Sequence, residues 1–205
     1  MFVLFTLTSF AMANPLDDHL DKISAKYKDV TGIQANFVQE TSNAFLPKPV
    51  VQEGVVHISK PSMLHWEFKT PMEQHFYADA EKITIWSPAQ NQVIISANQQ
   101  SNDISAVLTD LPSLQDKYLI QLVEDDTVPN MVQFSLSSKE EDALTQGDFS
   151  LWFAKETYTL SRVVVKTDNA LTTVKFADMT LNPKFETTEF VFTAPEGADI
   201  QDSRQ

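Results

Sequence analysis

Cysteine is absent from the 205-residue chain. Disulfide bonds, thiolate catalysis, iron–sulfur clusters and cysteine-based zinc sites are therefore excluded, as is a lipid anchor on an N-terminal cysteine. The sequence contains no Gly-x-Ser-x-Gly elbow for a serine nucleophile. Glycine is scarce, and its positions lie too far apart for a dinucleotide- or phosphate-binding loop: Gly32, Gly54, Gly147 and Gly197.

Basic residues are outnumbered by acidic ones. The chain has 15 Lys and Arg against 28 Asp and Glu, so its formal charge is 15 − 28 = −13. Nucleic-acid binding is excluded because it requires a basic surface, and the same charge disfavours docking on anionic lipid headgroups. A composition of 42% hydrophobic and 21% charged residues is that of an ordinary folded protein.

Long apolar runs are missing except at the N-terminus. Residues 1–10 are apolar with a few Thr and Ser, and Ala11-Met12-Ala13 supplies small residues for a cleavage site. This pattern predicts a secretory signal peptide over residues 1–13, although no Lys or Arg precedes the apolar run. The run is too short for a membrane span of about 20 residues. We therefore expect residues 14–205 to form one soluble, exported domain.

The first element of that domain is predicted to be an amphipathic helix. Asn14 is a good N-cap and Pro15 fits the first helical position. The helix is expected to end near Gly32. Its apolar stripe recurs at spacings of four, three and four: Leu16, Leu20, Ile23 and Tyr27.

Most of the remaining chain alternates between apolar and polar residues. Short runs of this kind, separated by turn residues, predict an antiparallel sheet curled into a sandwich or barrel. One further helix is expected over residues 101–111, where Val107 and Leu108 fall at helical spacing before Pro112. The fold class is therefore α+β, mainly β. The predicted strands cover residues 33–37, 54–59, 63–68, 83–86, 93–96, 118–123, 132–136, 149–153, 160–165, 172–179 and 190–192.

One face of this sheet is unusually apolar. Val56, Ile58, Leu64, Trp66 and Phe68 share one side of adjacent predicted strands. Such a face forms either a packed core or the wall of a cavity for an apolar ligand, and periodicity does not distinguish the two. Later strands add further large aromatic residues: Trp86, Trp152, Phe153 and Phe176.

Residues with catalytic or metal-binding chemistry form no recognisable constellation. His57, His65 and His75 lie on or beside neighbouring predicted strands, but at polar positions or in a connection, without an acidic partner at tight spacing. Because zinc needs three or four converging ligands, we expect no metal site. We also expect no cofactor and no enzymatic activity. A glycosidase-like carboxylate pair stays open, because such pairs meet only in space.

Residues 59–68, Ser-Lys-Pro-Ser-Met-Leu-His-Trp-Glu-Phe, resemble a signature of the LolA family of periplasmic outer-membrane lipoprotein carriers. Gly54 before this stretch and Thr70-Pro71 after it fit the same pattern. Other pieces follow in the family's order: residues 33–39, Asp79, Ile85-Trp86-Ser87-Pro88, Gln92-Val93 and residues 190–200. The resemblance spans nearly all of residues 14–205.

The resemblance implies an unclosed antiparallel β half-barrel with a helical lid over a hydrophobic cavity. Lys60 stands where the family usually has an arginine that latches the lid, and Asp79-Ala80 replaces an aspartate–glycine turn. A lysine latch would be weaker, because lysine lacks the planar fork of arginine. The implied lid residues are Leu16, Leu20, Ile23, Val107 and Leu108. The implied cavity residues are Val56, Ile58, Leu64, Trp66, Phe68, Trp86, Phe153 and Phe176.

The function implied by the resemblance is that of a soluble periplasmic carrier, expected to be a monomer. It would bind the acyl chains of lipoproteins released by an inner-membrane ABC-type complex and deliver them to the outer-membrane acceptor LolB. LolB is itself anchored through a cysteine, so this cysteine-free chain matches the soluble carrier better. Three alternatives remain: a binder or sensor of another lipid or glycolipid on the same fold, a hydrolase that acts on lipid or cell wall, and a protein with a solid β core that makes only protein contacts.

Overall fold

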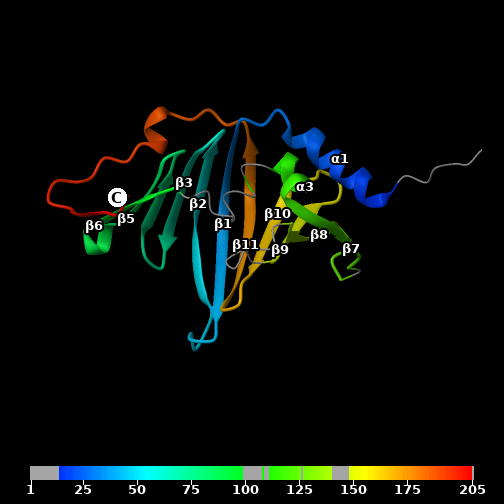
Figure 1. Cartoon of the computed structure of the whole chain (residues 1–205), viewed down its shortest axis with the longest axis horizontal. Coiled ribbons are helices and arrows are strands. Elements are labelled where there is room, and N and C mark those ends of the chain that lie inside the picture. The colour runs from blue at the N-terminus through cyan, green and yellow to red at the C-terminus, as the bar shows by residue number, and fades with distance from the viewer. Residues whose placement is uncertain (1–13, 99–107, 109–110, 126, 140–147, 205) are drawn as a thin grey trace, which may run out of the picture.

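The computed structural model describes residues 14–98, 108, 111–125, 127–139 and 148–204 (Figure 1). The predicted signal peptide, Val107 and most of the predicted 101–111 helix lie outside these residues. The helical segments are α1 (Pro15–Tyr27), η1 (Pro88–Gln90), η2 (Leu111–Ser113), α3 (Leu114–Lys117) and η3 (Thr187–Phe190). The strands are β1 (Gly32–Asn43), β2 (Val50–Ser59), β3 (Met63–Thr70), β4 (Gln74–Ala78), β5 (Lys82–Ser87), β6 (Gln92–Ala97), β7 (Tyr118–Val123), β8 (Met131–Ser138), β9 (Asp148–Ala154), β10 (Leu160–Lys166), β11 (Ala170–Leu181) and β12 (Asp199–Asp202).

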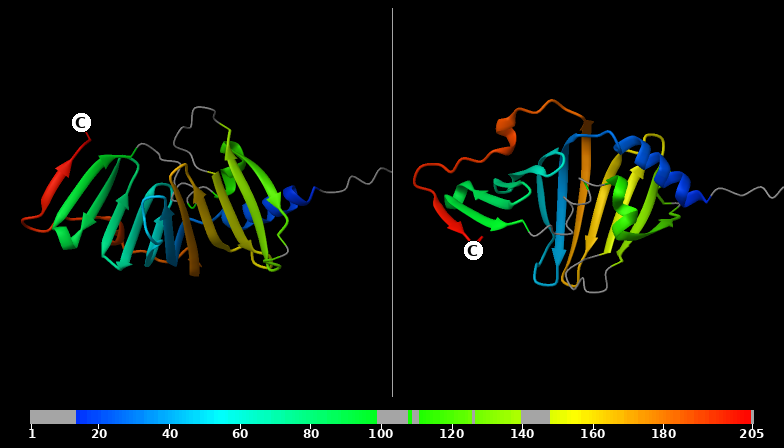
Figure 2. Two further views of the ribbon diagram at one scale, coloured as in Figure 1. Left: turned by 90° about the horizontal axis from the view of Figure 1, so that it is seen from below. Right: turned by 45° about the horizontal axis from the view of Figure 1, so that its top comes forward.

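All twelve strands form one sheet in the order β12-β6-β5-β4-β3-β2-β1-β11-β10-β9-β8-β7. Every neighbouring pair is antiparallel except β12 and β6, and β12 and β7 are the two ends of the sheet. Both ends turn toward the same side, so the sheet forms a trough (Figure 2). The predicted fold, an unclosed antiparallel half-barrel in a mainly β chain, is confirmed.

Helix α1 follows its sequence signals. The side chain of Asn14 accepts a hydrogen bond from the backbone N–H of Leu16 at 3.2 Å, and Pro15 occupies the first turn. The helix ends at Tyr27, five residues before the predicted end, because Gly32 already begins β1. Ile23 and Tyr27 are buried, so the predicted stripe faces the sheet.

Two strand predictions near the sheet edge were wrong. Strand β4 was missed, because all five of its residues are half-buried and show no alternation. Residues 190–192 form no strand, and the last strand of the sheet is instead β12, which pairs parallel to β6. The C-terminal residues are therefore paired up to Ser203, whose N–H donates to the carbonyl of Ile95 at 2.8 Å.

Residues 183–198, the C-terminal strap, connect β11 to β12 along the upper end of β1–β6 (Figure 1). Its aromatic rings contact the outer face of the sheet: Phe185 lies 5.5 Å from the His57 ring, and Phe192 lies 5.4 Å from the Tyr77 ring. Gly32 leaves the space for this contact, because a Cβ there would lie 2.9 Å from Phe185. The apolar alternation of 190–192 thus reflects strap packing.

Candidate functional site

The inner face of the trough carries the apolar residues of β1–β3. Val56 pairs with Trp66, and Ile58 pairs with Leu64, so these four side chains share one face, as the sequence predicted. All are buried, as is Phe68, and they belong to the same hydrophobic cluster as α1 residues Ile23 and Tyr27. The face therefore points toward the helices.

Aromatic rings form the floor of this face. Phe37 lies 5.0 Å from Trp66 and 5.2 Å from Phe68, measured between ring centroids. Phe76 from β4 lies 5.6 Å from Phe68, and Phe176 from β11 lies 6.4 Å from Trp66. Phe76 and Phe176 are only half-buried, so the aromatic floor reaches partly exposed margins on both sides. Phe37 and Phe76 were not among the predicted site residues, although Phe37 alternates in phase with Ile33 and Ala35.

Trp86 and Trp152 lie on the opposite face. The register pairs Trp86 with His75, which places Trp86 on the outer face, where its ring lies 5.8 Å from Phe192 of the strap. Trp86 therefore does not line the inner face, contrary to the sequence-based assignment. Trp152 is likewise on the outer face, with the guanidinium of Arg162 4.9 Å from its ring. Its neighbour Phe153 points inward and is buried.

The lid helix α1 covers the β8–β10 part of the trough. Leu20 and Ile23 face Phe134 and Phe153 across a shared cavity, and Leu16 packs against the same core. Leu108 is buried in this core too. Of the five predicted lid residues, the structure thus brings four to the inner side and does not describe Val107.

Three polar contacts fasten α1 to the β9–β10 hairpin. The hydroxyl of Tyr27 accepts a hydrogen bond from the backbone N–H of Leu160 at 3.0 Å. The ammonium of Lys26 donates to the carbonyl of Thr157 at 2.8 Å, and His19 Nδ1 lies 2.8 Å from the hydroxyl of Tyr158. Burial raises the pKa of Tyr27 to about 12, so its hydroxyl stays protonated. The predicted apolar stripe contains Tyr27, but no sequence pattern indicates its hydrogen bond with Leu160.

A cavity of about 70 Å³ lies beneath α1. It is far smaller than the roughly 300–1,000 Å³ typical of small-molecule sites. Most of the cavity wall is apolar, and its lining includes Leu20, Ile23, Leu111, Phe134, Leu151 and Phe153.

Lys60 lies at the turn between β2 and β3, where it is half-buried. Its backbone N–H donates to the carbonyl of Thr31 at 2.8 Å, which ties this turn to the connection between α1 and β1. Lys60 therefore lies beside Thr31, which follows the last residue of the lid helix, Tyr27, by four positions. Its role as a latch stays a prediction.

One polar group on the aromatic floor has no partner among the residues that the structure describes. It is the indole Nε1 of Trp66, which is buried and makes no hydrogen bond there. A buried donor left unpaired costs about 1–3 kcal/mol. A carbonyl oxygen brought by a ligand would satisfy it.

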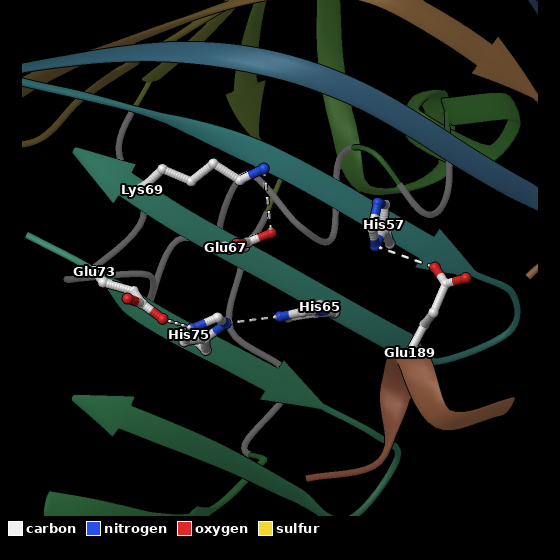
Figure 3. Close-up of polar contacts among 7 residues, drawn as sticks. All are labelled: His57, His65, Glu67, Lys69, Glu73, His75 and Glu189. Atoms are coloured by element: carbon white, nitrogen blue, oxygen red, sulfur yellow. Dashed lines mark hydrogen bonds and ion pairs between the residues drawn. The ribbon is translucent and has the colours of Figure 1, made fainter. Parts of the chain in front are cut away.

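Three histidines form a row on the outer face, across β2, β3 and β4 (Figure 3). His65 Nε2 lies 3.1 Å from His75 Nδ1, and His75 Nε2 lies 2.9 Å from a carboxylate oxygen of Glu73. His57 Nδ1 lies 3.4 Å from the carboxylate of Glu189 in the strap. Within the described residues, no three His, Asp or Glu side chains are arranged to hold a metal ion.

We expect the row to make the protein sensitive to acid. Burial, with His75 and His57 nearby, lowers the pKa of His65 from 6.5 to about 4. The unfolded chain therefore binds a proton more readily between these pH values, and the free energy of unfolding falls as the pH drops from about 7 to 4. The loss is on the order of 3 kcal/mol. Urea unfolding between pH 7 and 4 measures this loss in the wild type and in His65→Phe, which keeps an aromatic ring. If the free energy of unfolding fell equally with pH in both proteins, His65 would not be the cause.

The profile of the family described as "Outer membrane lipoprotein carrier protein LolA" matches residues 28–193. The chain belongs to the LolA family. The match contains the whole inner aromatic floor and all strands except β12, whereas the whole of α1 precedes it.

Relatives of this LolA-family chain extend over nearly its full length. It is 28% identical to the outer-membrane lipoprotein carrier protein of Vibrio vulnificus over 203 residues, 98% of this chain and 97% of the relative. It is 26% identical to that of Xanthomonas oryzae pv. oryzae, over 96% of this chain and 91% of the relative. An uncharacterized conserved protein from Thermus thermophilus shares the fold, with a TM-score of 0.56, 13% identity, and coverage of 92% of this chain and 99% of that one. In the described part of the chain, no helix combines the length and hydrophobicity needed to cross a membrane.

Proposed function

We propose that this protein is a soluble periplasmic carrier that binds the acyl chains of lipoproteins and delivers them to an outer-membrane acceptor. The observation that carries the proposal is the inner face, where an aromatic floor and an apolar cavity beneath α1 belong to one hydrophobic core. Curated relatives named as lipoprotein carriers support it. The partners on this proposal are acylated lipoproteins, an inner-membrane ABC-type releasing complex and LolB.

The cavity size suggests how loading works. Burial of one CH₂ group is worth about 0.8 kcal/mol, so three fully buried chains of ~16 carbons would exceed the ~20 kcal/mol at which non-covalent affinities saturate. Partial burial under a movable α1 avoids such irreversible binding and allows the chains to pass to an acceptor. On this proposal, the unpaired Nε1 of Trp66 would donate to an ester or amide carbonyl at the head of an acyl chain.

The decisive experiment is a release assay with spheroplasts. The protein is added to spheroplasts that make an acylated lipoprotein, and the soluble fraction is examined by native mass spectrometry. A complex of carrier and lipoprotein supports the proposal. A complex with a different lipid would identify the alternative binder or sensor, and a protein that emerges without any adduct and binds no apolar dye would point to a protein-contact function.

Tyr27→Phe is expected to loosen the lid. The substitution removes the acceptor for the buried N–H of Leu160, which costs about 1–3 kcal/mol in the closed form. If loading requires α1 to open, the apparent affinity for a fluorescent fatty acid should rise by about 5- to 100-fold. Tyr158→Phe, which alters only the more exposed contact with His19, should change the affinity much less. An affinity that falls with Tyr27→Phe would contradict a lid that opens for loading.

A further inference from the structure

The connection between β1 and β2 carries the most exposed of the large apolar side chains described. Phe45 is 85% exposed, and Leu46, Val50 and Val51 beside it are 36–48% exposed. Residues 43–51, the hairpin tip, project from the lower end of the sheet, away from α1 and the strap (Figure 1). The inner face does not explain these side chains, because they lie beyond the aromatic floor.

The hairpin tip is an ordered turn that holds Phe45 outward. The side chain of Asn43 accepts a hydrogen bond from the N–H of Phe45 at 2.9 Å, and its carbonyl accepts one from the N–H of Leu46 at 3.2 Å. Pro47 and Pro49 further restrict the backbone that follows. Little ordering entropy would therefore be lost when the tip meets a partner.

The charge of the tip differs from that of the chain. Residues 41–52 contain one charged side chain, Lys48, in a protein with a formal charge of −13. An anionic surface would repel most of the molecule but not the tip itself. The net charge of the whole protein disfavours membrane docking, but this argument does not apply to the tip.

We propose that the hairpin tip inserts shallowly into the headgroup–acyl boundary of an anionic bilayer. Its exposed aromatic and aliphatic side chains with one adjacent lysine are the composition that interfacial membrane contacts use. With one largely exposed ring, the tip should bind more weakly than a single myristoyl chain, whose membrane-binding constant is about 10⁴ M⁻¹. Contact would therefore be transient and would leave the protein free to diffuse.

The test uses protein purified from the periplasmic fraction and vesicles of phosphatidylethanolamine with phosphatidylglycerol as the minor component. Phe45→Trp places a fluorophore on the tip, and Val191→Trp places one at a similarly exposed site, 61%, in the strap at the opposite end. At millimolar lipid, the first variant should show a blue-shifted emission that nitroxide-labelled lipid quenches. The second should show neither effect.

The double variant Phe45→Ser, Leu46→Ser measures how strongly the hairpin tip contributes to vesicle binding. It should lower the vesicle partition coefficient at least about tenfold, because burial of such side chains is worth roughly one to two powers of ten each. Lipoprotein retention should be unchanged, which separates this proposal from the carrier function. Emission of Phe45→Trp that vesicles leave unaltered, or equal quenching of Val191→Trp, would overturn membrane insertion; a pocket on a protein partner would then be the remaining fit.

Discussion

Gly54→Ala should prevent stable folding. Gly54 lies on β2 beside a register irregularity between β2 and β3, and a Cβ there would lie 1.8 Å from the backbone carbonyl oxygen of Glu67 and 2.9 Å from Cζ of Phe37. The carbonyl belongs to the neighbouring strand and cannot move without separating β2 from β3. We expect the free energy of unfolding to fall by at least about 4 kcal/mol, which is exceptional for the addition of a single methyl group. Urea unfolding or loss of soluble expression measures it.

Gly197→Ala is the matched control. Gly197 has a φ of +76°, and nothing lies within 4 Å of the Cβ that alanine would add. The substitution therefore introduces only the conformational cost of the left-handed region, about 1 kcal/mol. A Gly54 variant no less stable than the Gly197 variant would show that close packing of β2 against β3 is not the reason for this glycine.

Phe176→Glu should abolish lipoprotein retention while the chain still folds. Phe176 is half-buried on β11 at the margin of the aromatic floor, 6.4 Å from Trp66, so a carboxylate there can reach water in the unloaded protein. A bound acyl chain would cover that carboxylate, and an unpaired buried charge costs several kcal/mol. We expect at least about a hundredfold loss in the spheroplast release assay.

Val38→Glu is the control for this variant. Val38 lies one position from Phe37, the partner of Phe176, but on the outer face, where it is 41% exposed and pairs with Lys175. A carboxylate at Val38 changes the net charge by the same amount and leaves the inner face intact. Retention should match the wild type. Retention lost in both variants would assign the effect to charge and not to the inner face.

The structure also shows which substitutions are suitable tests of the aromatic floor. Leu64 and Trp66 are obvious positions from the sequence, but both are at most 8% exposed and pack within the core. A glutamate at either position would destabilise the unloaded protein as well as the complex. Phe176 avoids this ambiguity because its margin is partly solvated.

The sequence alone determined α1, most of the strands and the resemblance to the family. Alternation in β1–β3 established that Val56, Ile58, Leu64 and Trp66 share a face, because successive side chains of a strand point to opposite sides. The cap at Asn14 and the apolar stripe located α1. Residues 59–68 and their surroundings pointed to the LolA family, which the profile match confirmed.

Tertiary structure alone decided which face each later strand presents. In β5 the alternation separates Trp86 from Ile85, but only the register with β4 shows that Trp86 faces outward with His75. The strap, the contact of Tyr27 with Leu160 and the row of histidines likewise join residues far apart in the chain. Periodicity describes one strand at a time, whereas the side of the sheet, the partner of a buried polar group and the space left under a helix depend on how separate elements pack.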